Sequence, residues 1–266
     1  MKSRRIATAV LAAASLAVVG ADVLAPESYS HQDRLAANAS PSLRSPLGRD
    51  ELGRDRFSRL LFATRMSLGC AAAAAIAATA VAALAGVAAG FGPRVIDEGL
   101  SGGIDLFLSV PWLFLLLTLR SLLPLNAPPW LSALLTFALL AGTGWPFGAR
   151  VIRARVRDLR RSPWIVHARA CGCREDRLLV RHVLPSLRPA LVAQYWTLVP
   201  IFILAEANLS VLGLGFAEPL PSWGGLLGEL RRVHRVAEAP WLLAPAVLMV
   251  AVVASLHTVL SEKTRG

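Results

Sequence analysis

Four side chains that can bind metal ions, two thiols and two imidazoles, fall within one short basic segment of the sequence. They are His167, Cys171, Cys173 and His182. His167 and Cys171 are one helical turn apart, but Cys-x-Cys with scattered histidines lacks the paired Cys-x-x-Cys spacing of a structural zinc site. The chain also has no Gly-x-x-x-x-Gly-Lys-Ser/Thr phosphate loop. Outside the basic segment, it has no cluster of His, Ser and carboxylate. We therefore predict no catalytic residue, no metal site and no cofactor.

Two carboxylates adjoin apolar runs and are candidates for a role at membrane depth. Glu206 follows the apolar run 189–205, and Asp105 precedes the run 106–119. Ionisable groups inside a membrane are costly and mark functional positions. We predict Glu206 and Asp105 as candidates to line a water-filled path through the membrane. The structural alternatives are that Glu206 caps a helix break ahead of Gly213 and that Asp105 lies at the cytoplasmic interface.

The composition combines strong hydrophobicity with strong positive charge. Of 266 residues, 55% are hydrophobic, mean hydropathy is +0.55, and the net charge is +11. These values exclude collagen, disorder and a disulfide scaffold. A nucleic-acid surface would interleave aromatic residues with its charges, whereas Trp164 is the sole Trp, Tyr or Phe in the most basic segment. We therefore predict a membrane protein without a nucleic-acid partner.

The apolar runs predict the elements that must position these residues, and they indicate an all-α membrane protein with about six spans. Three runs without charge exceed the roughly 20 residues that cross a hydrocarbon core, and three others are shorter. In chain order, the six are 6–21, 66–93, 106–119, 121–149, 189–205 and 239–261. The first run also fits a cleaved signal peptide. In the second, Gly86 and Gly90 have the small-xxx-small spacing that allows close helix packing.

The distribution of basic residues predicts the orientation and the domains. With a cytoplasmic N-terminus, 17 of the 28 Lys and Arg residues fall inside and 11 outside, as the positive-inside rule requires. We predict an N-terminal anchor with an extracytoplasmic segment over residues 1–65. A membrane domain is predicted over 66–262, with a cytoplasmic loop at 150–188.

This loop has internal order. Ser162-Pro163 is typical of a helix start, Gly172 permits a break, and a second helix is predicted over 174–184. There Leu179 with Val183, and Val180 with Leu184, are spaced to share one face, and Pro185 with Pro189 is predicted to end the helix. Such a helix pair suits either a groove on a soluble partner or the lipid surface.

The loop resembles the cytoplasmic coupling loop of ABC importer permeases. Its segment 168–172, Ala-Arg-Ala-Cys-Gly, precedes Leu184-Pro185, and the family signature is Glu-Ala-Ala, three residues, Gly, and a later Leu-Pro. Three further stretches are similar to the permeases of dipeptide and oligopeptide importers, so that the resemblance covers about residues 46–260 in order. These stretches are 50–55 with 58–60, 104–111, and 206–215 with 221–224. The sequence departs from the signature at Val166 and His167, where the family has Glu and Ala.

The resemblance implies a permease subunit of an ATP-driven importer in the inner membrane, with a peptide or related small solute as cargo. It implies a second homologous permease, cytoplasmic ATP-binding subunits and an extracytoplasmic substrate-binding protein as partners. It also favours an uncleaved first span. The residues expected to couple the permease to the ATPase are Ala168, Gly172, Leu179, Val183, Leu184 and Pro185. The alternatives are an ion-coupled secondary transporter, which would use charged or unwound positions near mid-membrane, and a membrane scaffold without transport activity.

Overall fold

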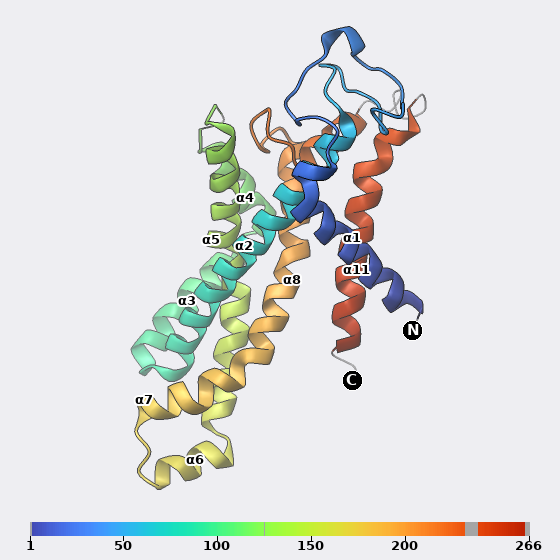
Figure 1. Cartoon of the computed structure of the whole chain (residues 1–266). Coiled ribbons are helices and arrows are strands. Elements are labelled where there is room, and N and C mark those ends of the chain that lie inside the picture. Colours follow the sequence, from blue (N-terminus) through green and yellow to red (C-terminus); the bar gives the residue numbers. More distant parts are fainter. Residues whose placement is uncertain (1, 125, 232–238, 264–266) are drawn as a thin grey trace. The chain divides into compact units, whose positions relative to one another are not determined.

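The structure is a computed structural model that describes residues 2–124, 126–231 and 239–263 (Figure 1). Within these residues it contains helices and no strand, which confirms the all-α prediction. The elements are α1 (Lys2–Leu24), η1 (Arg34–Ala36), α2 (Arg56–Phe91), α3 (Arg94–Ser109), α4 (Trp112–Ser121), α5 (Pro129–Arg160), α6 (Pro163–Ala170), α7 (Glu175–Leu178), η2 (Leu179–Val183), α8 (Leu184–Val211), α9 (Trp223–Leu227), η3 (Gly228–Arg231), η4 (Pro240–Leu243) and α11 (Ala244–Lys263).

The long helices confirm a polytopic membrane protein and correct its third span. Among the described residues, 5 helices are long and apolar enough to cross a membrane, and the bent pair α3 and α4 makes up to 6. The predicted span over 106–119 is not one straight helix, because the chain bends by 85° between α3 and α4. Pro111 explains the bend, since a residue before proline is driven from helical into extended geometry. Val110 has φ −90° and ψ 130°.

The helix α3 also replaces a predicted loop. The residues between the predicted spans 66–93 and 106–119 form the first part of α3. The connection from α2 is instead the short turn at Gly92 and Pro93. Proline fits at such a helix start because its missing N–H would have no intrahelical acceptor there.

The chain forms two compact units, which are described separately. The first comprises Met1–Ala72, Arg120–Phe137 and Val199–Gly266, and the second comprises Ala73–Leu119 and Ala138–Leu198. In the first unit, α1 packs along α11 (Figure 1).

In the second unit, the glycines of α2 bring this helix against α5. A Cβ atom on Gly86 would lie 2.7 Å from the carbonyl oxygen of Ala149, and one on Gly90 would lie 2.8 Å from the Cβ of Val156. Real Cβ atoms do not approach other atoms this closely. The close packing predicted from the small-xxx-small spacing is therefore confirmed, and backbone proximity replaces the hydrophobic driving force that lipid cannot supply.

Candidate coupling loop

The helix α6 begins and ends where its sequence predicts. Pro163 occupies the first turn, and at the other end the backbone follows a Schellman motif. The N–H of Gly172 donates to Arg169 O at 3.0 Å, and the N–H of Cys173 donates to Ala168 O at 3.1 Å. Gly172 has a φ of +82°, a conformation that favours glycine. The predicted break at Gly172 is thus a structured helix end.

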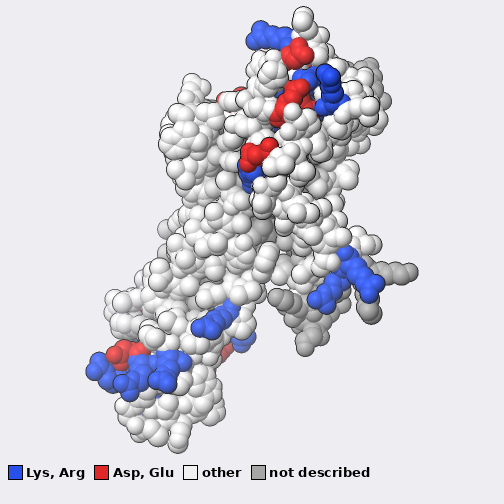
Figure 2. Space-filling model, in the orientation of Figure 1, with Lys and Arg blue, Asp and Glu red and all other residues white. Residues whose placement is uncertain are grey.

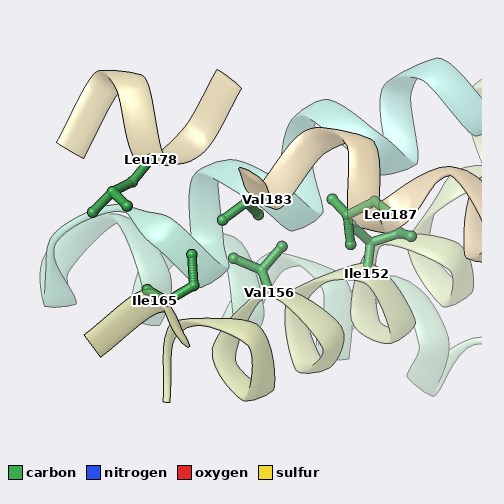
Figure 3. Close-up of a cluster of buried hydrophobic side chains, with 6 residues drawn as sticks. All are labelled: Ile152, Val156, Ile165, Leu178, Val183 and Leu187. Carbon is green, nitrogen blue, oxygen red and sulfur yellow. The ribbon is translucent and has the colours of Figure 1, made fainter. Parts of the chain in front are cut away.

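An apolar cluster holds the loop to the ends of the long helices (Figure 3). In this view, Ile165 from α6 and Leu178 from α7 lie at one end of the cluster, and Ile152 from α5 and Leu187 from α8 lie at the other. The six buried members are Ile152, Val156, Ile165, Leu178, Val183 and Leu187. All of them are at most 1% exposed. Since burying one such side chain is favourable by about 1.5–3 kcal/mol, the cluster fixes α6 and α7 to the second unit.

A π-helical turn changes the second loop helix from the predicted one. Over η2, the N–H of Leu184 donates to the carbonyl of Leu179, five residues back. The helix therefore continues into α8 and runs through Pro185, and the prediction that Pro185 ends it is wrong. A proline ring clashes with the carbonyl four residues earlier in a regular α-helix, and the wider π turn is the usual way to insert an extra residue into the ladder.

This turn also changes which residues share a face. The prediction that Leu179 with Val183, and Val180 with Leu184, form one face is wrong. Val183 is fully buried, while Val180 is 63% exposed. Leu178, one residue before this turn, is buried in the cluster. A π turn adds one residue to the helical repeat, so that Leu178 and Val183 are aligned at a spacing of five.

The six residues expected to couple to an ATPase fall into two groups. Val183 lies in the buried cluster, and Ala168 and Leu179 pack against it. Gly172, Leu184 and Pro185 are exposed. Ile165 and the pair Ile152 and Val156 belong to the same cluster but were not among the predicted residues. The last two are spaced i, i+4 within the basic loop, which was a signal that α5 continues past its apolar run.

Ion pairs surround the tip of this loop. Arg169 donates to both oxygens of Glu175, with Nε–Oε1 at 2.5 Å and Nη2–Oε2 at 3.1 Å. The hydrogen bond with Glu175 raises the pKa of the Arg169 guanidinium above its ordinary value, so the guanidinium stays charged. Of the metal-binding candidates, His167 Nε2 lies 3.7 Å from Cys171 Sγ, whereas Cys173 packs against the apolar cluster.

The two membrane carboxylates have different surroundings. Asp105 has a side chain that is 63% exposed and forms an ion pair with Arg150 in the second unit. Glu206, in the first unit, is fully buried. Its Oε1 accepts hydrogen bonds from Ser210 Oγ at 2.6 Å and Ser222 Oγ at 2.8 Å. Ser222 in turn caps α9, because its Oγ accepts the N–H of Gly225. Glu206 thus ties the end of α8 to the start of α9.

Two of the other stretches that carried the resemblance, 50–60 and 206–224, lie in the first unit. Arg54 Nε donates to Asp50 Oδ2 at 2.6 Å, and its Nη1 donates to Glu218 Oε2 at 2.5 Å. Burial opposes the charge of Arg54, but the hydrogen bond with Asp50 and the charges of both carboxylates raise its pKa. The segment before α2 is therefore held by ion pairs to the loop before α9.

Trp223 makes a second connection between α2 and α9. Its side chain is fully buried, and the indole N–H donates to Thr64 Oγ1 at 3.0 Å. Its backbone N–H donates to Ser67 Oγ, also at 3.0 Å.

Comparisons with known proteins agree with this arrangement. Residues 60–262 match the family described as "Binding-protein-dependent transport system inner membrane component". A putative peptide permease protein of Brucella ovis is 33% identical over 224 residues, 84% of this chain and 72% of the relative. The oligopeptide transport system permease protein OppC of Salmonella typhimurium is 32% identical over 148 residues, 56% of this chain and 46% of the relative. The dipeptide transport system permease protein DppC of Alkalihalophilus pseudofirmus is 31% identical over 156 residues, which are 59% of this chain and 49% of the relative. The chain belongs to the family of binding-protein-dependent transport system inner membrane components, and is a membrane-embedded transport permease.

Proposed function

We propose that this chain imports peptides as one permease subunit of an ATP-driven transporter. Its partners would be a second homologous permease, separate cytoplasmic ATP-binding subunits and an extracytoplasmic substrate-binding protein. The names of the Brucella, Salmonella and Alkalihalophilus relatives support a peptide cargo. The excess of basic residues in 150–188 supports a cytoplasmic N-terminus and loop. The packing of α1 along α11 supports α1 as a permanent anchor within the segment 1–65.

The observation that carries this proposal is the attachment of α6 to the buried cluster. A force applied to α6 by a closing ATPase passes through Ile165 and Ala168 into α5 and α8, because closely packed side chains transmit displacement. Leu179 and Val183 connect the same cluster to the start of α8. The exposed residues Val166 and Val180 offer apolar contacts to a partner.

Gly172 would set the angle at which α6 and α7 meet, while Leu184 and Pro185 lie at the start of the helix that receives the motion. A rigid-body switch between inward-open and outward-open states follows if both long helices move with the loop. Glu206 and Asp105 stay predictions for the translocation path.

Two glycines provide a matched test of coupling. Gly172 and Gly213 each end a helix through a Schellman motif, with φ of +82° and +83°, and neither has an atom within 4 Å of a built Cβ. A valine at either position introduces the same left-handed strain, about 1–3 kcal/mol. The full chain is expressed with its partner subunits, purified in detergent, and assayed for the ATPase that co-purifies.

We expect Gly172→Val to reduce the co-purified ATPase by about fivefold or more. A strain of about 1–3 kcal/mol at the end of α6 would displace this helix from the position in which it contacts the ATPase. Gly213→Val should leave it within about twofold. Membrane insertion of both variants is checked by extraction. Failure of the unmodified chain to retain any ATPase would contradict the proposed function. Equal loss in both variants would show that strain alone, and not its place in the loop, decides the result.

A further inference from the structure

A cavity lined by arginines opens at the base of the loop in the second unit. Its volume is about 470 Å³. The charged side chains that line it are Arg94, Arg157, Arg160, Arg161, Arg169 and Asp97. Figure 2 shows basic side chains gathered over this end of the unit, where few acidic ones accompany them. Five guanidinium groups around one carboxylate make the cavity strongly electropositive.

The positive charge exceeds what the neighbouring carboxylates neutralise. Arg94 pairs with Glu98 and Arg169 with Glu175. Asp97 is shared by Arg153 and Arg157, so that one charge of that trio is left over.

The remaining two arginines have no carboxylate partner within the described part of the chain. Arg160 Nη1 donates to the carbonyls of Gly90 and Phe91 at 3.3 and 3.0 Å, and its guanidinium lies 4.9 Å from the centroid of the Phe91 ring. These contacts orient Arg160 without cancelling its charge. Arg161 is exposed at the edge of the cavity. Together with the charge left over beside Asp97, about three positive charges at the cavity are therefore not neutralised by a carboxylate.

The start of α3 adds to this field. Arg94 is the first residue of α3 and lines the cavity. Pro93, at the N-cap position, makes no side-chain hydrogen bond to the helix. The first-turn N–H groups of a 16-residue helix with no such cap favour a negative charge nearby. In this cavity the helix end and the guanidinium groups act together.

The cavity lies at the depth of lipid headgroups. The uncharged part of α2, residues 66–91, rises about 39 Å at 1.5 Å per residue. A bilayer with its headgroups is about 40–45 Å thick. Gly90 and Gly92, which line the cavity, thus lie near the end of the span, where phospholipid phosphates are found.

We propose that this cavity binds the phosphate group of an anionic phospholipid. Guanidinium forks match phosphate oxygens in pairs, and basic pockets between transmembrane helices on the cytoplasmic side suit such headgroups. A phosphate seated here contacts residues of the α2–α3 turn, α5 and α6 at once. Lipid binding at this point would stiffen the base of the loop, and the site needs no ATPase to form.

Lipid binding is measured on the full chain in a neutral detergent by native mass spectrometry. Phosphatidylglycerol and phosphatidylcholine are titrated separately, because both carry a phosphate but only the first has a net negative charge. A soluble arm uses inorganic phosphate and glycerol 3-phosphate, with thermal unfolding as the readout. We expect phosphatidylglycerol to bind about tenfold or more tightly than phosphatidylcholine, and the soluble phosphates to have little effect at the same concentrations.

Paired variants locate the site. Arg157→Gln with Arg161→Gln removes two charges that line the cavity, while Arg153 still holds Asp97. Arg155→Gln with Arg181→Gln removes two exposed charges from the same loop away from the cavity. At about fivefold per arginine near a membrane surface, the first pair should weaken phosphatidylglycerol binding about 25-fold. The second pair should change it by less than about threefold. If the first pair unfolds the chain, Arg161→Gln alone should weaken binding about fivefold.

Three outcomes would overturn the proposal. Equal weakening by both pairs would mean a diffuse surface charge and no site. Binding of soluble phosphate as tight as that of phosphatidylglycerol would replace the lipid with a free anion. Unchanged lipid binding, together with loss of ATPase from the cavity variant only, would make the arginines a contact for the protein partner. Lipid binding is measured without the ATPase, so its result is independent of the test of the proposed function.

Discussion

Gly86 in α2 lies so close to Ile152 in α5 that a Cβ atom on the glycine would be 2.7 Å from the Cβ atom of the isoleucine. We predict that Gly86→Ala lowers the free energy of unfolding by about 1–3 kcal/mol, because two backbones must separate to admit one methyl group. Gly142→Ala, in α5, is the matched control, since nothing lies within 4 Å of its Cβ. Thermal unfolding in detergent measures both. A stable Gly86→Ala variant would show that the helices are not held at this distance.

The packing of Gly86 was predictable, and the register of the loop was not. Small residues at four-residue spacing state directly which helix face can approach another backbone. The π turn at η2 depends on one extra residue within 179–183, and nothing in a periodic pattern marks where such a residue is absorbed. That single residue moved Leu178 into the cluster and Val180 out of it. Pro185 was the available signal, since a helix through it needs a wider turn before it.

For the bend of the third span and for the site residues, too, the sequence shows the motifs but not how they pack together. Pro111 is evident in the sequence. Whether the apolar residues on its two sides form one helix or two depends on tertiary packing. The stretches around Asp50 and Trp223 could be recognised as motifs. Their contact could not be predicted, because the ion pair of Arg54 with Glu218 joins residues far apart in the chain.

The hydrogen bond between Trp223 and Thr64 predicts energetic coupling between α9 and α2. Trp223→Phe removes the indole donor, and Thr64→Val removes the acceptor at 3.0 Å. Each single variant should unfold more easily, and the double variant should lose less than their sum by about 0.5–1.5 kcal/mol. Thermal or denaturant unfolding of the four proteins gives this value. Strictly additive losses would mean that the two side chains do not act as a pair.

We predict that Glu206 stabilises the fold by accepting hydrogen bonds from the hydroxyl groups of Ser210 and Ser222. Glu206→Ala leaves two buried hydroxyl groups without that acceptor and should destabilise the chain by about 1–3 kcal/mol. Glu206→Gln keeps an oxygen at the same position and should cost less than half as much. Proteolysis of the segment after Ser222, compared with thermal unfolding, reports whether α9 is released. Equal harm from both variants would indicate that the charge, and not the acceptor, is required.

Ile165 and Val166 are neighbours in α6 with opposite surroundings. Ile165 is fully buried in the cluster, and Val166 is 51% exposed. We predict that Ile165→Ala lowers the free energy of local unfolding of α6 by about 2–4 kcal/mol, because it leaves a cavity. Val166→Ala should change this free energy by less than about 0.5 kcal/mol. Hydrogen exchange of residues 163–178 measures the difference locally. Similar protection in both variants would contradict the assignment of Ile165 as the tie between α6 and the cluster.

Val166 also allows the departure from the family signature to be tested. The signature places Glu there, and the exposed side chain admits a carboxylate without burying its charge. We predict that Val166→Glu leaves thermal unfolding unchanged and increases the ATPase that co-purifies, because a carboxylate on this face can pair with a basic group of the partner. Val166→Gln, of the same size without the charge, is the control. An equal gain from both variants would assign the effect to hydrogen bonding alone, and a loss from Val166→Glu would mean that this chain's partner has adapted to an apolar contact.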